Sequence, residues 1–404
     1  MSQSLLTPTA LRRASLDAVL GFAWDADALT ASDVIEHVGL TRSTAIDVVD
    51  ELVERGLLAE LPNARAVGEY QKGRPARRFA FREDSGYVVG LDAGRAHLTA
   101  TVADLRGAAR AVRHLAADAS HDSPEDRRRD AARVVDDALA AAGITRTDVV
   151  ALCVGVPAPV DRNGASPPHR DDFWRRMNPS FGDLFGEWAP IVRVENDASL
   201  AAVAERAVGA AVGCDDFVTL LAGERLGAGV WVDGTPLRGA HGGAAEMVAF
   251  DHVAGVEGAW GLGYRVAELA RRALAEASLP SSSALWGLDS AQIDAKTVLA
   301  LASEGDAGAV LVARQVGETL AVIAGVLGSL FDSRRIIVSG AVAAGAGPVI
   351  DAALDALPQE LDLPAPEIVA SDLGADIVSV GAVRAAVEAA RGGALDLPRF
   401  VAAS

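Results

Sequence analysis

The chain has 404 residues, 50% of them hydrophobic and 23% charged, which is typical of a soluble globular protein of two or three domains. Two cysteines, Cys153 and Cys214, are too few for a disulfide framework or a four-cysteine metal site. Because the N-terminus carries no signal peptide pattern, we expect a cytoplasmic protein. The net charge of −18 excludes a protein that coats nucleic acid with its whole surface, but a local basic region remains compatible with it. Apolar stretches such as 320–330 are short and interrupted by glycine, so we expect no membrane span.

Residues 1–84 carry the pattern of a helix-turn-helix. Apolar spacing predicts a first helix over 11–19 and a second over 30–37, and a tight turn at Gly39-Leu40-Thr41 leads into a third helix over 42–55. The third helix is expected to turn three apolar residues inward: Ile46, Val49 and Val53. Its first turn is then the part of a recognition helix that reaches base edges.

A basic hairpin follows this helix. Strands are predicted over 56–61 and 76–81, and the segment between them would form a wing, since residues 65–82 carry a net charge of +5 in an acidic chain. The extended Gly73-Arg74-Pro75 sequence is suited to entering a narrow minor groove. A solvated hairpin tip with ordinary charges is the alternative. The residues that we expect to contact DNA are Arg42, Ser43, Thr44, Lys72, Arg74 and Arg77.

After a boundary near 83–86, the chain alternates strands and helices. Strands are predicted over 87–92, 98–104, 149–154, 191–195 and 335–339, and helices over 123–142, 198–208, 309–330 and 371–390. The run Arg127-Arg128-Arg129 is expected to be a solvated helix face, because acidic residues flank it.

The most informative stretch runs from 220 to 246. Apolar residues alternate about Asp233-Gly234, a strong hairpin signal, and Gly223, Gly227 and Gly229 predict a glycine-rich loop leading into it. The glycine-dense run 238–243 implies close approach of the backbone to another group, and Glu246 follows it. With Asn196-Asp197 upstream, this pattern indicates a polyol pocket beside a phosphate cradle.

Three sequence motifs together resemble the ROK family of sugar kinases and sugar-responsive repressors: VENDA at 194–198, DGTPLRGAHGGAAE at 233–246 and the weaker GLDAGRAH at 90–97. The resemblance implies an α/β, two-lobed actin-like ATPase (ribonuclease H-like) fold, here with an N-terminal winged helix-turn-helix domain. We expect a DNA-binding domain over 1–84, a first lobe over 85–205, a second lobe over 206–370, and a C-terminal helix over 371–404 that packs back on the first lobe.

The resemblance also implies site residues. Asp197 matches the general base of the family's kinases, Asn196 would hold neighbouring hydroxyls, and Glu246 matches the acid of the family's GEIGH motif. Asn178 lies where the family often places a sugar-contacting Asn. A helix cap is an alternative role for the Asn196-Asp197 pair. We therefore expect ligand binding at Asn178, Asn196, Asp197 and Glu246, and no catalytic residue, with Asp197 a vestige of the kinase base.

The sequence departs from the family pattern at three places. In the corner that resembles DxGGTK, Asp92 and Gly94 stand, but the three following positions hold Arg95, Ala96 and His97. In the second phosphate loop, residues 223–227 include a carboxylate and two bulky side chains. The family's zinc-binding segment corresponds to 255–263, which holds no cysteine, and the histidine of GEIGH is replaced by alanine. We expect no cofactor and no metal.

We therefore predict a ligand-responsive transcription regulator, a repressor, that binds a double-stranded DNA operator and a carbohydrate effector. Because one winged helix reads a short site, a homodimer or homotetramer is expected. An active ATP-dependent sugar kinase with a DNA-binding extension is one alternative. A regulator that senses a partner protein in place of a small molecule is the other.

Overall fold

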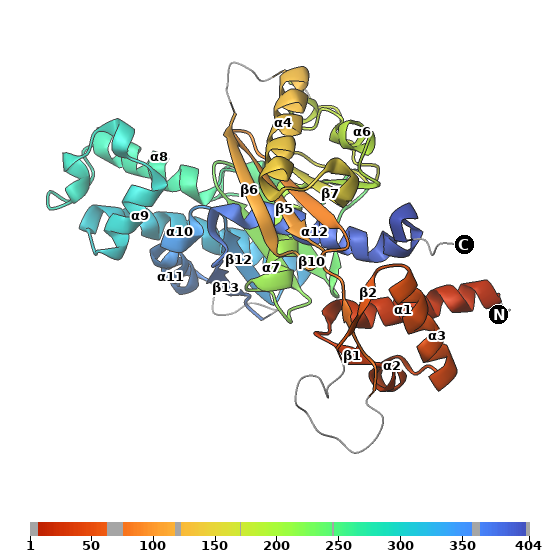
Figure 1. Cartoon of the computed structure of the whole chain (residues 1–404). Helices are drawn as coiled ribbons and strands as arrows, with labels where there is room; N and C mark the ends of the chain where they lie inside the picture. The colour runs from red at the N-terminus through yellow and green to blue at the C-terminus, as the bar shows by residue number, and fades with distance from the viewer. Residues whose placement is uncertain are drawn as a thin grey trace.

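The computed structural model describes residues 7–62, 76–117, 123–169, 171–244, 246–357 and 364–400. These residues form a small N-terminal domain and two larger lobes, each built on a five-stranded sheet (Figure 1).

The N-terminal domain contains three helices and a three-stranded sheet. Its helices are α1 (Pro8–Asp25), α2 (Ala31–Val38) and α3 (Arg42–Glu54), and its strands are β1 (Leu29–Thr30), β2 (Leu58–Leu61) and β3 (Arg78–Phe81). A capping box between Thr30 and Asp33 starts α2, Gly39 ends it with a left-handed φ of 77°, and Thr41 caps α3. The predicted helix-turn-helix and the paired strands of the wing are confirmed. Residues 63–75, including Lys72 and Arg74, lie outside the described ranges.

The buried face of α3 differs from the prediction. Its buried residues follow an i, i+3, i+4, i+7 pattern: Ala45, Val48, Val49 and Leu52. The prediction is right for Val49 but wrong for Ile46, which is 39% exposed, and Val53 is only partly buried. The prediction did not consider Ala45 and Leu52, which belong to the buried face of the helix. With these residues facing the core, Ile46 points outward.

The first lobe has the strand order β6-β5-β4-β7-β8. Its strands are β4 (Tyr87–Ala93), β5 (His97–Asp104), β6 (Ala109–Ala116), β7 (Val149–Val156) and β8 (Ile191–Asn196). The first three form an antiparallel meander, and β7 and β8 run parallel to β4. Helix α4 (Pro124–Ala142) connects β6 to β7, while α5 (Phe173–Met177) and α6 (Phe181–Gly186) precede β8.

The second lobe repeats this topology in the order β11-β10-β9-β12-β13. Its strands are β9 (Phe217–Ala222), β10 (Leu226–Val232), β11 (Thr235–Pro236), β12 (Arg335–Ser339) and β13 (Glu367–Ala370). Again the first three are antiparallel and the last two run parallel to the first. The duplicated sheet confirms the two-lobed actin-like fold that the sequence predicts.

Two helices join the lobes. Helix α7 (Asp197–Val208) follows the first sheet but also packs on β9 and β10 of the second. Helix α12 (Ile377–Gly393) follows the second sheet but packs on β4 and β7 of the first, and the two helices pack on each other. The predicted boundary between the two lobes, at 205/206, falls within α7.

The outer part of the second lobe is helical: α8 (Leu262–Ala275), α9 (Ala295–Ser303), α10 (Ala307–Phe331) and α11 (Gly347–Ala356). The expectation that this apolar region is too short for a membrane span is wrong as to length, because α10 has 25 residues and is long and apolar enough to cross a membrane. Half of its most apolar part is nevertheless buried, and it packs on α8, α9 and α11, as a core helix does.

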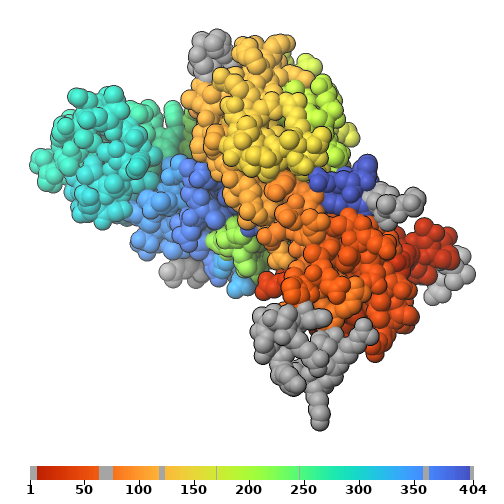
Figure 2. Space-filling model, in the orientation of Figure 1, coloured from red at the N-terminus to blue at the C-terminus, as the bar shows by residue number. Residues whose placement is uncertain are grey.

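The N-terminal domain is joined to the body by a shared hydrophobic core that includes α1, α3 and α12. The buried indole of Trp24 donates a hydrogen bond to the Leu105 carbonyl (3.0 Å). Arg391 of α12 pairs with Asp25 and donates to the Gly21 carbonyl, both on α1. In the space-filling view the N-terminal domain lies directly against the C-terminal end of the chain (Figure 2). A movement of α12 relative to the first lobe would therefore act directly on the N-terminal domain.

Candidate functional site: an acidic cleft and a winged helix

Three acidic side chains lie close together where segments of the two lobes meet, and we call this region the acidic cleft. Asp197 begins α7, Asp92 lies on β4 and is only 5% exposed, and the backbone of Glu246 bridges to Gly227 on β10. Burial, together with the neighbouring carboxylates of Asp92 and Glu246, raises the pKa of Asp197 to about 7. Asp197 therefore changes charge near neutrality in this cleft.

Asn196 and Asp197 also form the start of α7. The Asn196 Oδ1 accepts from the Ser199 amide (3.0 Å), and its Nδ2 donates to the Ala158 carbonyl (3.2 Å) and to Asp197 Oδ1 (3.1 Å). Asp197 Oδ1 also accepts from the Ala198 amide (2.7 Å). The predicted alternative role as a helix cap is thus present in Asn196, and it fixes the orientation of the adjacent Asp197 carboxylate.

Asn178 lies among the irregular segments before β8 and is 7% exposed. Its Nδ2 donates to the Gly164 carbonyl and to Ser166 Oγ, both at 3.0 Å. Its Oδ1 is buried without a hydrogen-bond partner among the described residues. The amide therefore anchors the 164–166 turn and keeps one acceptor unused.

Glu246 is exposed, yet its surroundings in the cleft raise its pKa, mainly by desolvation, against the favourable charges of Arg225 and His169. The glycine run before it makes the close approach that the sequence predicts. A Cβ on Gly242 would lie 1.9 Å from the Val160 carbonyl oxygen, so this segment crosses the backbone of the first lobe.

The predicted glycine-rich loop is only partly correct. Gly227 and Gly229 lie within β10, where a Cβ on Gly229 would be 2.4 Å from the Ala198 carbonyl oxygen. This glycine allows α7 to pack against the strand, so its role is helix packing at the base of the cleft. Gly223 alone lies in the β9–β10 turn.

The β4–β5 corner is filled by protein side chains. The His97 Nε2 lies 3.0 Å from Asp92 Oδ2, and this hydrogen bond raises the pKa of His97. The same ring covers Gly94, where a Cβ would be 2.9 Å from His97 Cε1. Across the cleft, Arg95 Nη1 lies 3.4 Å from both carboxylate oxygens of Glu224. An ion pair thus connects the two segments that correspond to the family's phosphate loops.

The expectation of a solvated arginine face at 127–129 is wrong for two of the three residues. Arg127 is 3% exposed and donates to the carbonyls of Ala93 (2.9 Å) and Gly94 (3.3 Å). Arg128 donates to the carbonyls of Pro179 and Ser180. The charge pattern could not reveal these contacts because their acceptors are backbone carbonyls of distant segments.

The first turn of α3 presents its side chains to solvent. Arg42 and Ser43 are exposed, and the Thr41 hydroxyl lies 3.2 Å from Ser43 Oγ and 2.9 Å from Thr44 Oγ1. Arg77 is held differently. It donates to Asp50 on α3 and to Glu60 on β2, both at 2.8 Å, and lies over the Phe79 ring. Arg77 therefore links the wing strands to the recognition helix.

The family model described as "ROK family" matches residues 88–384, which is most of the chain. The chain belongs to the ROK family. The xylose repressor of Bacillus subtilis is 23% identical over 221 residues, covering 54% of this ROK chain and 55% of that repressor. The chain thus spans about half the length of the curated relatives it matches.

Solved ROK structures share the fold. A ROK family transcriptional regulator, described as a homolog of the E. coli MLC protein, is 20% identical with a TM-score of 0.75, covering 96% of this chain and 99% of that one. A ROK family glucokinase from Streptomyces griseus, in complex with glucose and AMPPNP, is 26% identical with a TM-score of 0.56, covering 75% and 100% of the two chains. The regulator match therefore extends over nearly the whole of this chain, whereas the glucokinase match extends over three quarters of it.

The segment that corresponds to the family's zinc site has no set of zinc ligands. Within the described ranges, no group of three or more His, Cys, Asp or Glu side chains could hold a metal ion. The guanidinium of Arg265 instead donates to the carbonyls of Val256 (2.5 Å), Gly258 (2.7 Å) and Trp260 (3.0 Å). In this ROK protein, hydrogen bonds from an arginine hold together the segment for which the family commonly uses a metal.

Proposed function

We propose that this ROK protein is a DNA-binding transcription regulator, a repressor, whose body senses a sugar or sugar derivative. DNA binding is assigned to the first turn of α3 and to the wing, with Arg42, Ser43 and Thr44 at the base edges and Lys72, Arg74 and Arg77 on the wing side. Sugar binding is assigned to the cleft, with Asn178, Asn196, Asp197 and Glu246 as its polar contacts.

One structural observation carries this proposal. Helix α7 begins at Asp197 and packs on α12, and α12 shares a hydrophobic core and the Arg391–Asp25 ion pair with α1 of the DNA-binding domain. A ligand that contacts Asp197 therefore lies two packed helices away from that domain. A ligand that binds more tightly to one relative position of these helices would shift the protein toward that position. The resulting change in the free energy of DNA binding equals the change in the free energy of ligand binding that DNA causes.

The relatives support this assignment at a coarser level. The name of the xylose repressor joins repression with a sugar, and the glucokinase structure contains glucose. Both support a carbohydrate as the ligand class for this cleft.

The side chains in the β4–β5 corner, which corresponds to a phosphate loop of the family's kinases, argue against an active kinase. Phosphoryl transfer requires a base, a cradle for the γ-phosphate and neutralisation of the moving charge. Asp197 could serve as the base, but His97 lies over Gly94 and Glu224 adds a carboxylate where the nucleotide phosphates would approach. We therefore propose that Asp197 binds ligand without catalysing phosphoryl transfer, and that the protein acts as a homodimer or homotetramer on a two-fold operator.

The test is to select genomic fragments with the full chain and to assay the same preparation for ATP-dependent phosphorylation of a hexose and amino-sugar panel. The proposal predicts enrichment of discrete intergenic sites and no phosphorylated product. Product formation that Asp197→Asn abolishes would instead establish the kinase alternative.

A thermal-shift screen with the same panel separates the remaining alternative. A sugar that binds only the folded protein must raise its melting temperature. Absence of any shift, together with confirmed operator binding, would favour a body that senses a partner protein.

A further inference from the structure

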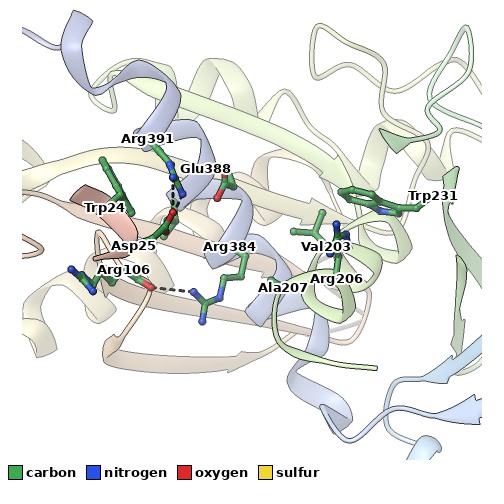
Figure 3. A pocket seen from close by; sticks show the side chains of 11 residues that line it. Trp24, Asp25, Arg106, Val203, Arg206, Ala207, Trp231, Arg384, Glu388 and Arg391 are labelled. Carbon is green, nitrogen blue, oxygen red and sulfur yellow. Dashed lines mark hydrogen bonds and ion pairs between the residues drawn. The ribbon is translucent and has the colours of Figure 1, made fainter. Parts of the chain in front are cut away.

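A cavity of about 640 Å³ lies where the DNA-binding domain, both lobes and the two connecting helices meet (Figure 3). Its walls include Trp24 and Asp25 of α1, Arg106 of the β5–β6 turn, Arg206 of α7, Trp231 of β10 and Arg384 of α12. It lies apart from the acidic cleft, whose residues do not line it. The proposed sugar site and DNA contacts leave this cavity without a role.

Arginines dominate the polar lining of this junction cavity. Four arginines, including Arg391, line it together with two acidic residues, Asp25 and Glu388, although the whole chain carries a net charge of −18. Asp25 pairs with Arg391, and Glu388 is exposed. Arg106 and Arg206 also have carboxylate neighbours outside the lining, Glu83 at 3.4 Å and Asp215 at 2.9 Å.

Arg384 differs from the other three. Its guanidinium forms no ion pair with a described residue, and its hydrogen bond goes to the Arg106 backbone carbonyl (3.1 Å). Figure 3 shows the side chain directed toward that carbonyl and away from Glu388. The guanidinium lies against Gly107, whose φ of +84° favours glycine in the β5–β6 turn. The fold thus places an arginine in the cavity with most of its donors unused.

One further donor is unused. The Nε atom of Arg206 is buried and has no hydrogen-bond partner among the described residues, whereas the Nε of Arg106 lies 3.4 Å from a Glu83 carboxylate oxygen. Buried donors in native proteins are nearly always paired, and an unoccupied ligand position is one explanation when they are not. Arginine donors arranged around a cavity match the oxygens of phosphate and carboxylate groups.

We propose that the junction cavity binds a small organic anion through phosphate or carboxylate oxygens, and that this anion acts as a second effector. Arg384, Arg106 and Arg206 would hold the oxygens, and the half-buried Trp231 offers an apolar wall for the rest of the molecule. Because Trp24 and Asp25 belong to the DNA-binding domain, the bound anion fixes that domain against the body. The binding itself is independent of the proposed sugar function, whereas the effect on DNA rests on the proposed regulator function.

The binding test uses inorganic phosphate and succinate as separate probes, with ionic strength held constant by sodium chloride. Ala207 is an exposed residue in the last turn of α7 and part of the lining, so Ala207→Glu adds a carboxylate to the cavity. Arg384→Gln removes the arginine that lacks an ion pair. We expect at least one probe to raise the melting temperature of the wild-type protein, and each variant to weaken its apparent Kd about tenfold, the effect of losing one charge-assisted contact.

One variant serves as a control. Arg314→Gln removes a surface arginine of α10 whose ion-pair partner among the described residues is Glu318. This variant should retain the wild-type response. General stabilisation by phosphate salts acts on all variants alike, so the difference between them is decisive. Equal responses in the wild type, Ala207→Glu and Arg384→Gln, or no response to either probe, would overturn the proposed site.

The DNA test measures operator affinity with and without the active probe. The second-effector proposal predicts a change in wild-type affinity that Ala207→Glu abolishes and Arg314→Gln retains. Probe binding without any change in DNA affinity would leave the anion site standing and refute its regulatory role. Absence of operator binding in every condition would count against the proposed function and not against the site.

Discussion

Arg95 and Glu224 face each other across the mouth of the cleft, with the Arg95 guanidinium 3.4 Å from both Glu224 carboxylate oxygens. One residue belongs to the first lobe and the other to the second, so the pair connects the lobes. Both side chains are about two-thirds exposed, at 66% and 65%. An ion pair this exposed contributes little to the free energy of unfolding. We expect it instead to restrain the opening of the cleft.

Arg95→Ala should accelerate entry and exit of the sugar effector while changing the free energy of unfolding by less than about 1 kcal/mol. Stopped-flow binding measures both rate constants, and chemical denaturation measures the stability. The wild-type protein in about 1 M salt is a matched control, because a Debye length of about 3 Å screens the same pair. Rates unaffected by both the substitution and the salt would show that the pair does not restrain the cleft.

Asp197→Asn should remove part of the pH dependence of stability. Burial raises the pKa of Asp197 from its ordinary 3.8 to about 7. Between these values the folded state holds a proton that the unfolded chain has lost, so stability falls as pH rises through this interval. The variant should therefore gain more in melting temperature, relative to wild type, above pH 7 than near pH 3.8. A constant difference across the interval would contradict the raised pKa.

Arg265→Leu should loosen the 256–260 segment. The change removes donors from three backbone carbonyls and should cost about 1–3 kcal/mol of unfolding free energy. Trp260 stacks on Tyr264, so its fluorescence should report the local change. Arg272→Leu, at an exposed position of the same helix, is the matched control. Zinc addition should rescue neither variant, and a rescue would reveal a metal site that the described residues do not suggest.

Arg42→Ala and Arg77→Ala should affect DNA binding in different ways. Arg42 is exposed in the first turn of α3, and its loss should reduce discrimination between operator and altered sites by about 1–3 kcal/mol. Arg77 is paired with Asp50 and Glu60, so its loss should weaken binding to all duplexes alike and lower domain stability modestly. Affinity measurements on operator and point-mutated duplexes distinguish them, and identical specificity profiles would contradict the assignment.

The sequence predicts the fold well because its signals are local. Helix caps such as Thr30, the Asp233-Gly234 turn and strand periodicity act within a few residues, and the corresponding elements are found in the structure. Two of the predictions that fail involve contacts between segments far apart in the sequence. The burial of Arg127 depends on carbonyls more than thirty residues away, and the role of Gly229 depends on the approach of α7.

The candidate site, like the fold, could be predicted only where its signal is a local sequence motif. The motif around Asn196-Asp197 identifies the cleft, but the sequence does not reveal that Arg95 meets Glu224 or that His97 bonds Asp92. The sequence does not predict the junction cavity at all, because its lining comes from five separate segments: α1, the β5–β6 turn, α7, β10 and α12. Only the three-dimensional packing of these elements places Arg384 beside the Arg106 carbonyl.

The most direct test of a sugar-responsive DNA-binding protein is the affinity of the full chain for its selected operator, measured by fluorescence anisotropy with and without each sugar of the panel. The account predicts tight binding relative to a scrambled duplex, a change in affinity with at least one sugar, and loss of that change in Asp197→Asn while sugar-free affinity is retained. Equal affinity for operator and scrambled duplexes, or a sugar response that Asp197→Asn leaves intact, would contradict it.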